Sequence, residues 1–198
     1  MKFMPIAAAA LAAIALSGCV APVGPVEVTR FHVPGPSPLG VGAIAVEAGP
    51  GADGRSLEFS SYASAVARDL VRVGYTEVGP GDLGRSVALV RIERQSYRPD
   101  RRRGPVSVGV GGSAGSYGSG VGLGVGIDLS GPPPEQVQTL LAVTIKDRAS
   151  GQALWEGRAN FTVKASSPLA TTQLGAAKLA EALFRGFPGR SGETIEVR

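Results

Sequence analysis

The chain has 198 residues, which is enough for one domain with a hydrophobic core and short for two. A formal net charge of +4 is too small to indicate a nucleic-acid partner, and none is expected. The single cysteine excludes an internal disulfide, so packing must hold the fold together. The 29 glycines and 15 prolines exceed ordinary usage and are concentrated in a few segments.

Residues 1–18 have the organisation of a signal peptide. Lys2 supplies a positive charge, and Phe3 to Leu16 follow as an uncharged run of about 14 residues. Roughly 20 apolar residues are needed to span a bilayer as a helix, so this run is typical of a cleaved leader rather than an anchor. It ends in Leu16-Ser17-Gly18-Cys19, which resembles the bacterial lipobox.

The lipobox resemblance implies that Cys19 is acylated and becomes the first residue of the mature protein. Two or more acyl chains hold a protein lastingly on a membrane. Val20 stands where an Asp favours retention in the inner membrane, so the resemblance implies transport to the outer membrane, with the domain facing the periplasm. Residues 19–25 form a lipidated tether that reaches only about 20 Å, which places the domain close to the lipid headgroups.

One domain is expected over residues 26–198, and its first half combines strands with a helix. The pattern predicts a strand over Glu27 to Val33 and an apolar run over Ala43 to Val46. Ser56 can cap a helix, and Gly74 stands where a helix-ending glycine belongs. Between them, apolar residues at helical spacing predict a buried face made of Phe59, Tyr62, Val66, Leu70 and Val73.

The second half predicts three further strands, a helix and an edge strand. Val87 to Tyr97 is expected as a strand, with Ala88, Val90 and Ile92 on its inner face. Apolar residues then alternate from Val137 to Ile145 and from Trp155 to Val163, on either side of a turn at Asp147 to Gly151, which predicts a hairpin with Trp155 in the core. Ser167-Pro168 is expected to open the second helix, with a buried side made of Leu169, Ala176, Ala180, Leu183, Phe184 and Phe187. Thr194 to Val197 is expected at a sheet edge.

The predicted fold class is α+β. Strands that follow one another directly favour an antiparallel sheet, here of about five to six strands, with two helices packed on one face. A glycine-rich hairpin or loop is inserted over residues 104–131.

An ordered set of short patterns runs through this domain. It consists of Val28-Thr29-Arg30-Phe31-His32, Ser56-Leu57-Glu58-Phe59 with Tyr62, Gly74-Tyr75, Leu140 through Asp147, Ser150-Gly151, and Leu154-Trp155-Glu156-Gly157. Together these patterns resemble the bacterial lipoproteins of domain of unknown function 4136, over most of residues 26–188. The resemblance implies an outer-membrane or periplasmic lipoprotein, and it brings no established activity and no catalytic residues.

The insertion holds 11 glycines in 28 residues and leaves three interpretations open. Two arms in which glycine alternates with apolar residues suggest a hairpin with one apolar face, which could contact another protein. Arms of about 10 residues also match membrane-crossing strands, but crossing would require several chains, because one hairpin leaves its edges unsatisfied in lipid. A mobile loop is the third interpretation. Gly109 to Ala114 fits a dinucleotide fingerprint, but no helix follows, so no such cofactor is expected.

Six arginines gather in one stretch, from the second half of the strand at Val87 to Tyr97 to the start of the insertion. They are Arg91, Arg94, Arg98, Arg101, Arg102 and Arg103. The last four are candidates for contact with anionic lipid headgroups, through guanidinium–phosphate hydrogen bonds. A solvated loop beside the insertion is the alternative interpretation.

Catalytic chemistry has little support in the sequence. His32 is the only histidine and lies in a predicted strand without a Ser or Asp motif beside it, which favours a structural role. Acylation would consume Cys19, and no His/Cys cluster has metal-ligand spacing, so neither a metal nor a cofactor is expected.

The leading hypothesis is therefore a non-catalytic lipoprotein that binds or supports another envelope component, either a protein or an anionic lipid. An envelope-acting hydrolase, whose carboxylate pair assembles only in the fold, is one alternative. Assembly of several copies through the glycine-rich hairpin is another, and the oligomeric state stays open.

Overall fold

The computed structural model describes residues 24–35, 39–79, 82, 84–100, 106–115, 118–127 and 132–198. The predicted signal peptide and Cys19 lie outside these residues. The elements in chain order are β1 (Val26–His32), β2 (Ala43–Ala48), α2 (Leu57–Arg72), β3 (Thr76–Val78), β4 (Ser86–Tyr97), β5 (Val106–Gly115), β6 (Gly118–Ile127), β7 (Gln136–Asp147), β8 (Ala153–Lys164), the 3₁₀ turn η1 (Pro168–Ala170), α3 (Thr172–Phe184) and β9 (Thr194–Val197).

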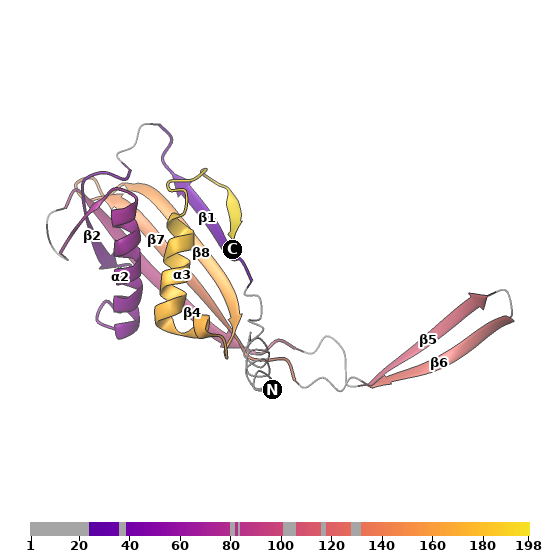
Figure 1. Cartoon of the computed structure of the whole chain (residues 1–198). Coiled ribbons are helices and arrows are strands. Elements are labelled where there is room, and N and C mark those ends of the chain that lie inside the picture. The colour runs from indigo at the N-terminus through magenta and orange to yellow at the C-terminus, as the bar shows by residue number, and fades with distance from the viewer. Residues whose placement is uncertain are drawn as a thin grey trace, which may run out of the picture.

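A seven-stranded sheet with two helices on one face forms the body of the molecule (Figure 1). The strand order is β3-β2-β4-β7-β8-β1-β9. This confirms the α+β class and the packing of both helices against one face. Strand β9 lies at one edge of the sheet, as the sequence predicts.

The prediction of an antiparallel sheet of five to six strands is partly wrong, because the sheet is mixed and has seven strands. Four antiparallel pairs link β4, β7, β8, β1 and β9, but β2 is parallel to both β3 and β4. Helix α2 carries the chain back across the sheet after β2, so the next strands enter in the same direction. The missed strand, β3, has only three residues, too few for a period of two to be visible in the sequence.

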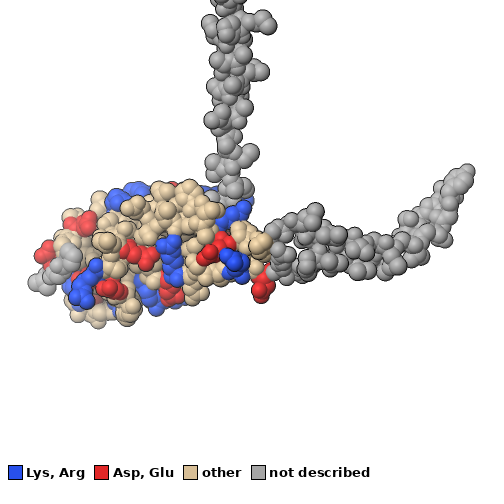
Figure 2. Space-filling view, turned by 90° about the horizontal axis from the view of Figure 1, so that it is seen from below, with Lys and Arg blue, Asp and Glu red and all other residues tan. Residues whose placement is uncertain are grey.

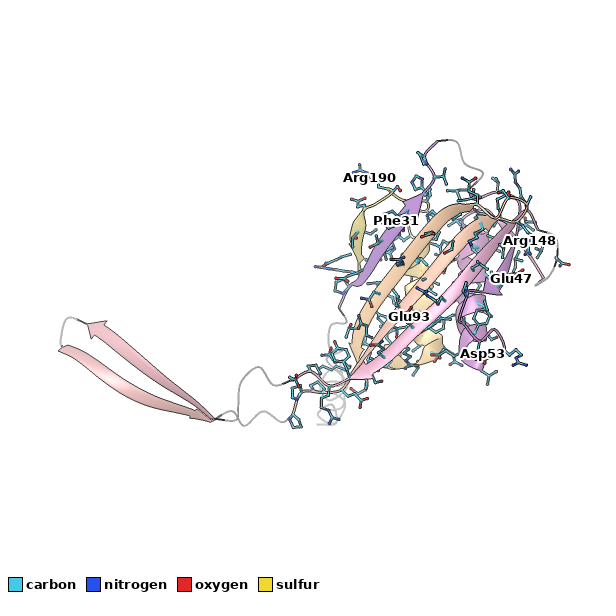
Figure 3. All side chains as sticks on the ribbon, turned by 180° about the vertical axis from the view of Figure 1, so that it is seen from behind. Phe31, Glu47, Asp53, Glu93, Arg148 and Arg190 are labelled. Carbon is cyan, nitrogen blue, oxygen red and sulfur yellow. The ribbon has the colours of Figure 1, made fainter. Side chains whose placement is uncertain are left out.

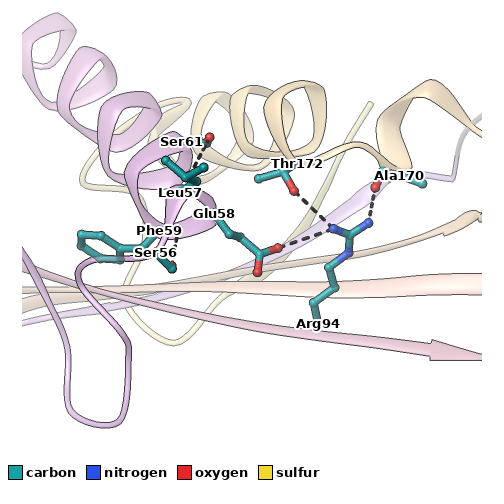
Figure 4. Close-up of polar contacts among 8 residues, drawn as sticks. All are labelled: Ser56, Leu57, Glu58, Phe59, Ser61, Arg94, Ala170 and Thr172. Carbon is teal, nitrogen blue, oxygen red and sulfur yellow. Dashed lines mark hydrogen bonds and ion pairs between the residues drawn. The ribbon is translucent and has the colours of Figure 1, made fainter.

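Helix α2 begins and ends as predicted. The Phe59 backbone N–H donates to Ser56 Oγ at 3.0 Å, and Gly74 has the positive φ of +110° that suits a residue just after a helix. Arg94 of β4 holds this helix beside η1 and α3 (Figure 4). Its Nη1 donates to Glu58 Oε1 at 3.5 Å and to Thr172 Oγ1 at 3.3 Å, and its Nη2 donates to the Ala170 carbonyl.

The second helix starts later than predicted. Ser167 caps only the 3₁₀ turn, where the Leu169 N–H donates to its Oγ at 3.3 Å. Thr171 then adopts an extended backbone, and α3 begins at Thr172. Phe187 lies beyond the end of α3 and is half-buried against the core. In the part of the chain that the structure describes, neither helix has the length and apolar character needed to span a bilayer.

Trp155 lies at the centre of the core, as predicted from the alternation of apolar and polar residues between Trp155 and Val163. Its exposed fraction is 1%, and its ring stacks on Phe184 with centroids 5.4 Å apart and lies 5.2 Å from the ring of Phe187. Gly157, two residues later on the same face of β8, leaves room for this ring. A Cβ at Gly157 would collide with the indole and lie 2.8 Å from Leu183 Cδ1.

The glycine-rich insertion forms a separate two-stranded sheet, in which β5 pairs antiparallel with β6. The register sets Val108 opposite Val125 and Val110 opposite Leu123. Glycine pairs stand at the positions between them, as at Gly109 and Gly124. Because alternate residues of a strand lie on opposite faces, the apolar positions of both strands share one face of the hairpin.

Replacing Gly157 with alanine tests the packing around Trp155. We expect the free energy of unfolding to fall by about 1–3 kcal/mol, because the added methyl must displace the indole or Leu183. Gly24→Ala is the matched control, since a Cβ at Gly24 meets nothing within 4 Å. Urea unfolding followed by tryptophan fluorescence measures both variants. Equal stability of the two variants would contradict the close packing.

Candidate functional site

Arg30 is a buried cation that the helix layer encloses. It follows Val26 and Val28 on the inner face of β1, and its exposed fraction is 4%. Its Nε donates to the Leu183 carbonyl at 2.9 Å, and its Nη2 donates to the carbonyls of Ala182 and Arg185 at 3.0 and 2.8 Å. These are carbonyls of the last turn and end of α3, where a helix carries partial negative charge. Arg30 therefore caps the C-terminal end of α3 from the sheet.

A pocket of about 500 Å³ opens beside this guanidinium. It lies between the inner face of β1 and β9 and the segment that leaves α3, and it is lined by Val28, Arg30, Arg185, Gly186, Pro188, Gly189, Arg190, Glu193 and Ile195. The Nη1 of Arg30 has no hydrogen-bond partner among the described residues. Burial lowers the pKa of the Arg30 guanidinium from its ordinary value, while the charge of Glu193 raises it.

Close contacts hold the segment after α3 against the sheet. Trp155 Nε1 donates to the Pro188 carbonyl at 3.0 Å, so the core tryptophan is bonded to a residue of the pocket wall. Gly189 has a φ of +80°, and a Cβ there would lie 2.7 Å from Arg30 Nη1. Glycine is therefore required at this position both for its backbone conformation and for the approach of the guanidinium.

His32 fastens the same segment. Its two ring nitrogens lie 3.1 Å from the Val33 carbonyl oxygen and 3.3 Å from the Gly189 carbonyl oxygen. Its backbone N–H donates to Ser191 Oγ at 3.1 Å. These contacts agree with the structural role that the sequence favours for this histidine.

The carboxylates of the described residues do not converge in this pocket. Of the described residues, Glu193 supplies the one carboxylate in its lining. The most buried carboxyl among them is that of Asp69 on α2, which forms an ion pair with Arg72. The negative charge of Glu181 on α3 also acts on it. Burial raises the pKa of Asp69. Over the described ranges, no three His, Cys, Asp or Glu residues gather as metal ligands would.

The face of the sheet away from the helices is open and mixed in charge (Figure 3). Arg148 donates to Glu47 Oε1 at 2.6 Å near one end of this face. A smaller hollow of about 190 Å³ lies on this face over β4, β7 and β8, lined by Glu93, Gln95, Gln138, Leu140 and Asn160. Gln138 Nε2 donates to Asn160 Oδ1 at 3.3 Å across it, so two of the polar groups that line this hollow are paired with each other.

Only one of the predicted contact residues lies in the described part of the chain. Arg98 is exposed and directly follows the end of β4, whereas Cys19, Arg101, Arg102 and Arg103 lie outside the described residues. The arginine run is also divided by the sheet, because Arg94 packs on the helix side while Arg91 forms an ion pair with Glu93 at 3.3 Å.

The register places Arg98 at the end of the sheet where β1 begins. Glu27 is level with Asn160, Leu140 and Glu93 across four neighbouring strands, and β4 runs on from there to Tyr97. The segment before β1 and the segment after β4 therefore leave the sheet at the same end. Figure 2 looks at the molecule from this side, where Lys and Arg alternate with Asp and Glu instead of forming one positive field.

Sequence reasoning did not identify Arg30 as a site residue. One signal was available, because alternate residues of a strand lie on the same face, and the inner face of this strand carries Val26, Val28 and Arg30. A charged residue on an inner face is almost never fully buried without a partner. Its partners here are backbone carbonyls of a helix more than 150 residues later, which the sequence does not reveal.

Comparisons with known proteins identify relatives. A family model described as domain of unknown function (DUF4136) matches residues 45–189. The chain is 28% identical to uncharacterized protein ZMO1243 of Zymomonas mobilis, over 88% of this chain and 80% of that protein. It is similar to the PelC dodecamer from Paraburkholderia phytofirmans, with a TM-score of 0.43, 13% identity and coverage of 79% of this chain and 96% of that one.

A PDZ domain protein from Parabacteroides distasonis is also similar, with a TM-score of 0.48 and 12% identity. The match covers 88% of this chain and 39% of that one. The TM-scores of both solved structures are too low for either to carry an argument about fold, ligand or assembly.

Arg30 variants test the capping of α3. Arg30→Leu leaves three buried or half-buried carbonyls without their donor, so we expect the free energy of unfolding to fall by at least about 2 kcal/mol. Arg30→Lys keeps the charge but loses the planar donor geometry and should restore part of that loss. Arg158→Leu, at an exposed position, should change stability by less than about 0.5 kcal/mol. Denaturant unfolding compares the three variants, and an Arg30→Leu variant as stable as Arg158→Leu would refute the capping role.

Proposed function

The chain belongs to the family described as domain of unknown function 4136, and from this premise we propose that it is a lipid-anchored cell-envelope lipoprotein with a non-catalytic binding or structural role. The sequence Leu16-Ser17-Gly18-Cys19 carries the proposal, because it ends an apolar leader with the chain's one cysteine. Acylation of Cys19 supplies the anchor, and Val20 directs the protein to the outer membrane, with the domain in the periplasm.

The geometry of the sheet supports a membrane-facing end. Val26 begins β1 seven residues after Cys19, and Arg98 leaves the sheet at the same end. A short tether therefore holds that end near the headgroups. Arg98, Arg101, Arg102 and Arg103 then contact lipid phosphates, which suit the donor geometry of the guanidinium group.

The composition of the pocket beside Arg30 supports binding over catalysis. Its ionisable lining residues are three arginines and Glu193. Nucleophilic catalysis needs a nucleophile held beside a base, and the described residues that line this pocket include neither a hydroxyl nor a thiol.

Cys19→Ser tests the anchor. Because acylation needs the thiol, we expect the variant to leave the membrane fraction or to accumulate as an uncleaved precursor. Ser17→Ala keeps a small residue in the lipobox and should leave both processing and membrane attachment unchanged. Fractionation of the envelope, with mass measurement of the mature N-terminus, distinguishes these outcomes. A Cys19→Ser protein that is processed normally and still sediments with outer membrane would contradict the lipoprotein proposal.

Assembly through the β5–β6 hairpin is a second candidate function, and the register of that hairpin favours it. The register gives the hairpin one face of apolar positions and one of glycine and serine. A lone two-stranded hairpin is marginally stable in water, and a partner that covers its apolar face would stabilise it. A second copy of this chain presents the same face and is the partner we propose.

Deleting residues 104–131 tests this assembly. In the described residues no strand of the main sheet pairs with the hairpin, so we expect nearly unchanged thermal stability. Loop closure adds only about 0.6 kcal/mol for each doubling of loop length. Sedimentation velocity should show loss of self-association, and Val110→Ser with Leu123→Ser should reproduce that loss. An unfolded deletion variant would refute a peripheral hairpin, and unchanged self-association would reduce the insertion to a spacer.

A further inference from the structure

We propose that the pocket beside Arg30 binds a small amphipathic anion, namely a carboxylate or a phosphate group carried on a short apolar chain. The inference names a ligand class for the non-catalytic binding role and rests on that part of the proposed function. It does not depend on the lipid anchor. Its three supports are a fixed cation, a surplus of positive charge at the rim, and an apolar floor.

The fixed cation is Arg30. Three hydrogen bonds to the carbonyls of Ala182, Leu183 and Arg185 hold its Nε and Nη2, so the plane of the guanidinium cannot turn. Nη1 stays without a partner in the described structure, on a side chain whose exposed fraction is 4% and which lines the pocket. Because the pocket is open to solvent, an anionic oxygen can reach this N–H and accept a charge-assisted hydrogen bond from it.

The rim adds positive charge with one opposing group. Arg185 and Arg190 line the pocket together with Arg30, against the single carboxylate of Glu193. Arg185 also donates to Glu181 Oε1 at 2.8 Å, yet its side chain stays 53% exposed. Arg190 is exposed at the end of the sheet where β1 finishes (Figure 3). Glu193 repels an incoming anion, so removing its charge should strengthen binding.

The floor is apolar. Val28 and Ile195 face each other across the β1–β9 pair, and Pro188 forms part of the wall. Among the described residues, no charged side chain other than those four lines the pocket. The volume of about 500 Å³ falls within the range of small-molecule sites, and it suits a headgroup with a short chain better than a bare ion.

Trp155 provides a direct readout of occupancy. It is the only tryptophan, and its Nε1 donates to the Pro188 carbonyl in the pocket wall. An occupant that moves Pro188 changes the surroundings of the indole and therefore its fluorescence.

The experiment titrates the full-length protein, at a fixed concentration of a neutral detergent, with octyl phosphate and octanoate. Octyltrimethylammonium is the cationic counterpart, and inorganic phosphate lacks the apolar chain. We expect a saturable change in Trp155 fluorescence with one or both amphipathic anions and none with the other two probes. The two anions distinguish a phosphate headgroup from a carboxylate. A response to octyltrimethylammonium of equal size, or no saturable response to either anion, overturns the proposal.

Surface variants locate the binding without disturbing the core. Arg190→Glu should weaken binding of the preferred anion by about 2- to 5-fold, and Glu193→Gln should strengthen binding by a similar factor. Changes of this size are expected because the interaction between two partly exposed charges is weak. Arg158→Glu makes the same charge change on the opposite face of the sheet and should leave the affinity unchanged. Equal weakening by Arg190→Glu and Arg158→Glu would overturn the assignment to this pocket.

The test of the ligand site is independent of the test of the anchor. Release of Cys19→Ser from the membrane is measured by fractionation, whereas ligand binding is measured by fluorescence, so failure of the anchor and failure of the ligand site are separate results.

Discussion

The fit of the Trp155 indole over Gly157 is the contact on which the helix layer and the pocket both depend. An indole can lie flat against β8 only where the next residue on that face has no side chain. The ring in turn sets how closely the end of α3 approaches, through its stacking on Phe184. Its N–H then fixes the chain beyond the helix at Pro188. One large side chain thus positions the sheet, the helix and the pocket wall together, which gives a physical meaning to the Trp155-Glu156-Gly157 pattern.

Two arginines from the sheet hold the two ends of α3. Arg94 contacts Thr172 at the start of the helix and balances its own charge against Glu58. Arg30 donates hydrogen bonds to the carbonyls at the other end, where the helix carries partial negative charge. That charge balances the guanidinium, so Arg30 needs no carboxylate to remain buried as a cation. The pocket is a consequence of this second arrangement. Nε and Nη2 of this guanidinium donate to three carbonyls on one side, and Nη1 lies on the other side, where Gly189 of the segment after α3 packs against it at the wall of the pocket.

Much of the fold follows from periodicity, and what does not follow concerns partners distant in sequence. The alternation from Trp155 to Val163 and the spacing from Phe59 to Leu70 identify inner faces, and Ser56 and Gly74 mark helix ends. Periodicity says which face of a strand is buried but not which strand lies beside it. The parallel pairing of β2 with β3 and β4 is therefore not given by periodicity, and its one signal is the order strand, helix, strand around α2. Arg30 was missed for the same reason, since its carbonyl partners come from the far end of the chain.

The polarity of the sheet separates the two proposed contacts. Helix α3 starts beside Arg94, near the level of β1's first residues, and ends beside Arg30. Its 13 residues span about 20 Å, and Arg30 lies near its far end. The pocket extends from Arg30 back along β1 to Val28, which is two residues, or about 7 Å, from the first residue of the strand. With Cys19 anchored as proposed, the charged end of the pocket faces away from the end where Arg98 leaves the sheet, and its apolar floor reaches toward that end. The polar group of an amphipathic ligand and its apolar chain are therefore recognised at different levels of the same strand.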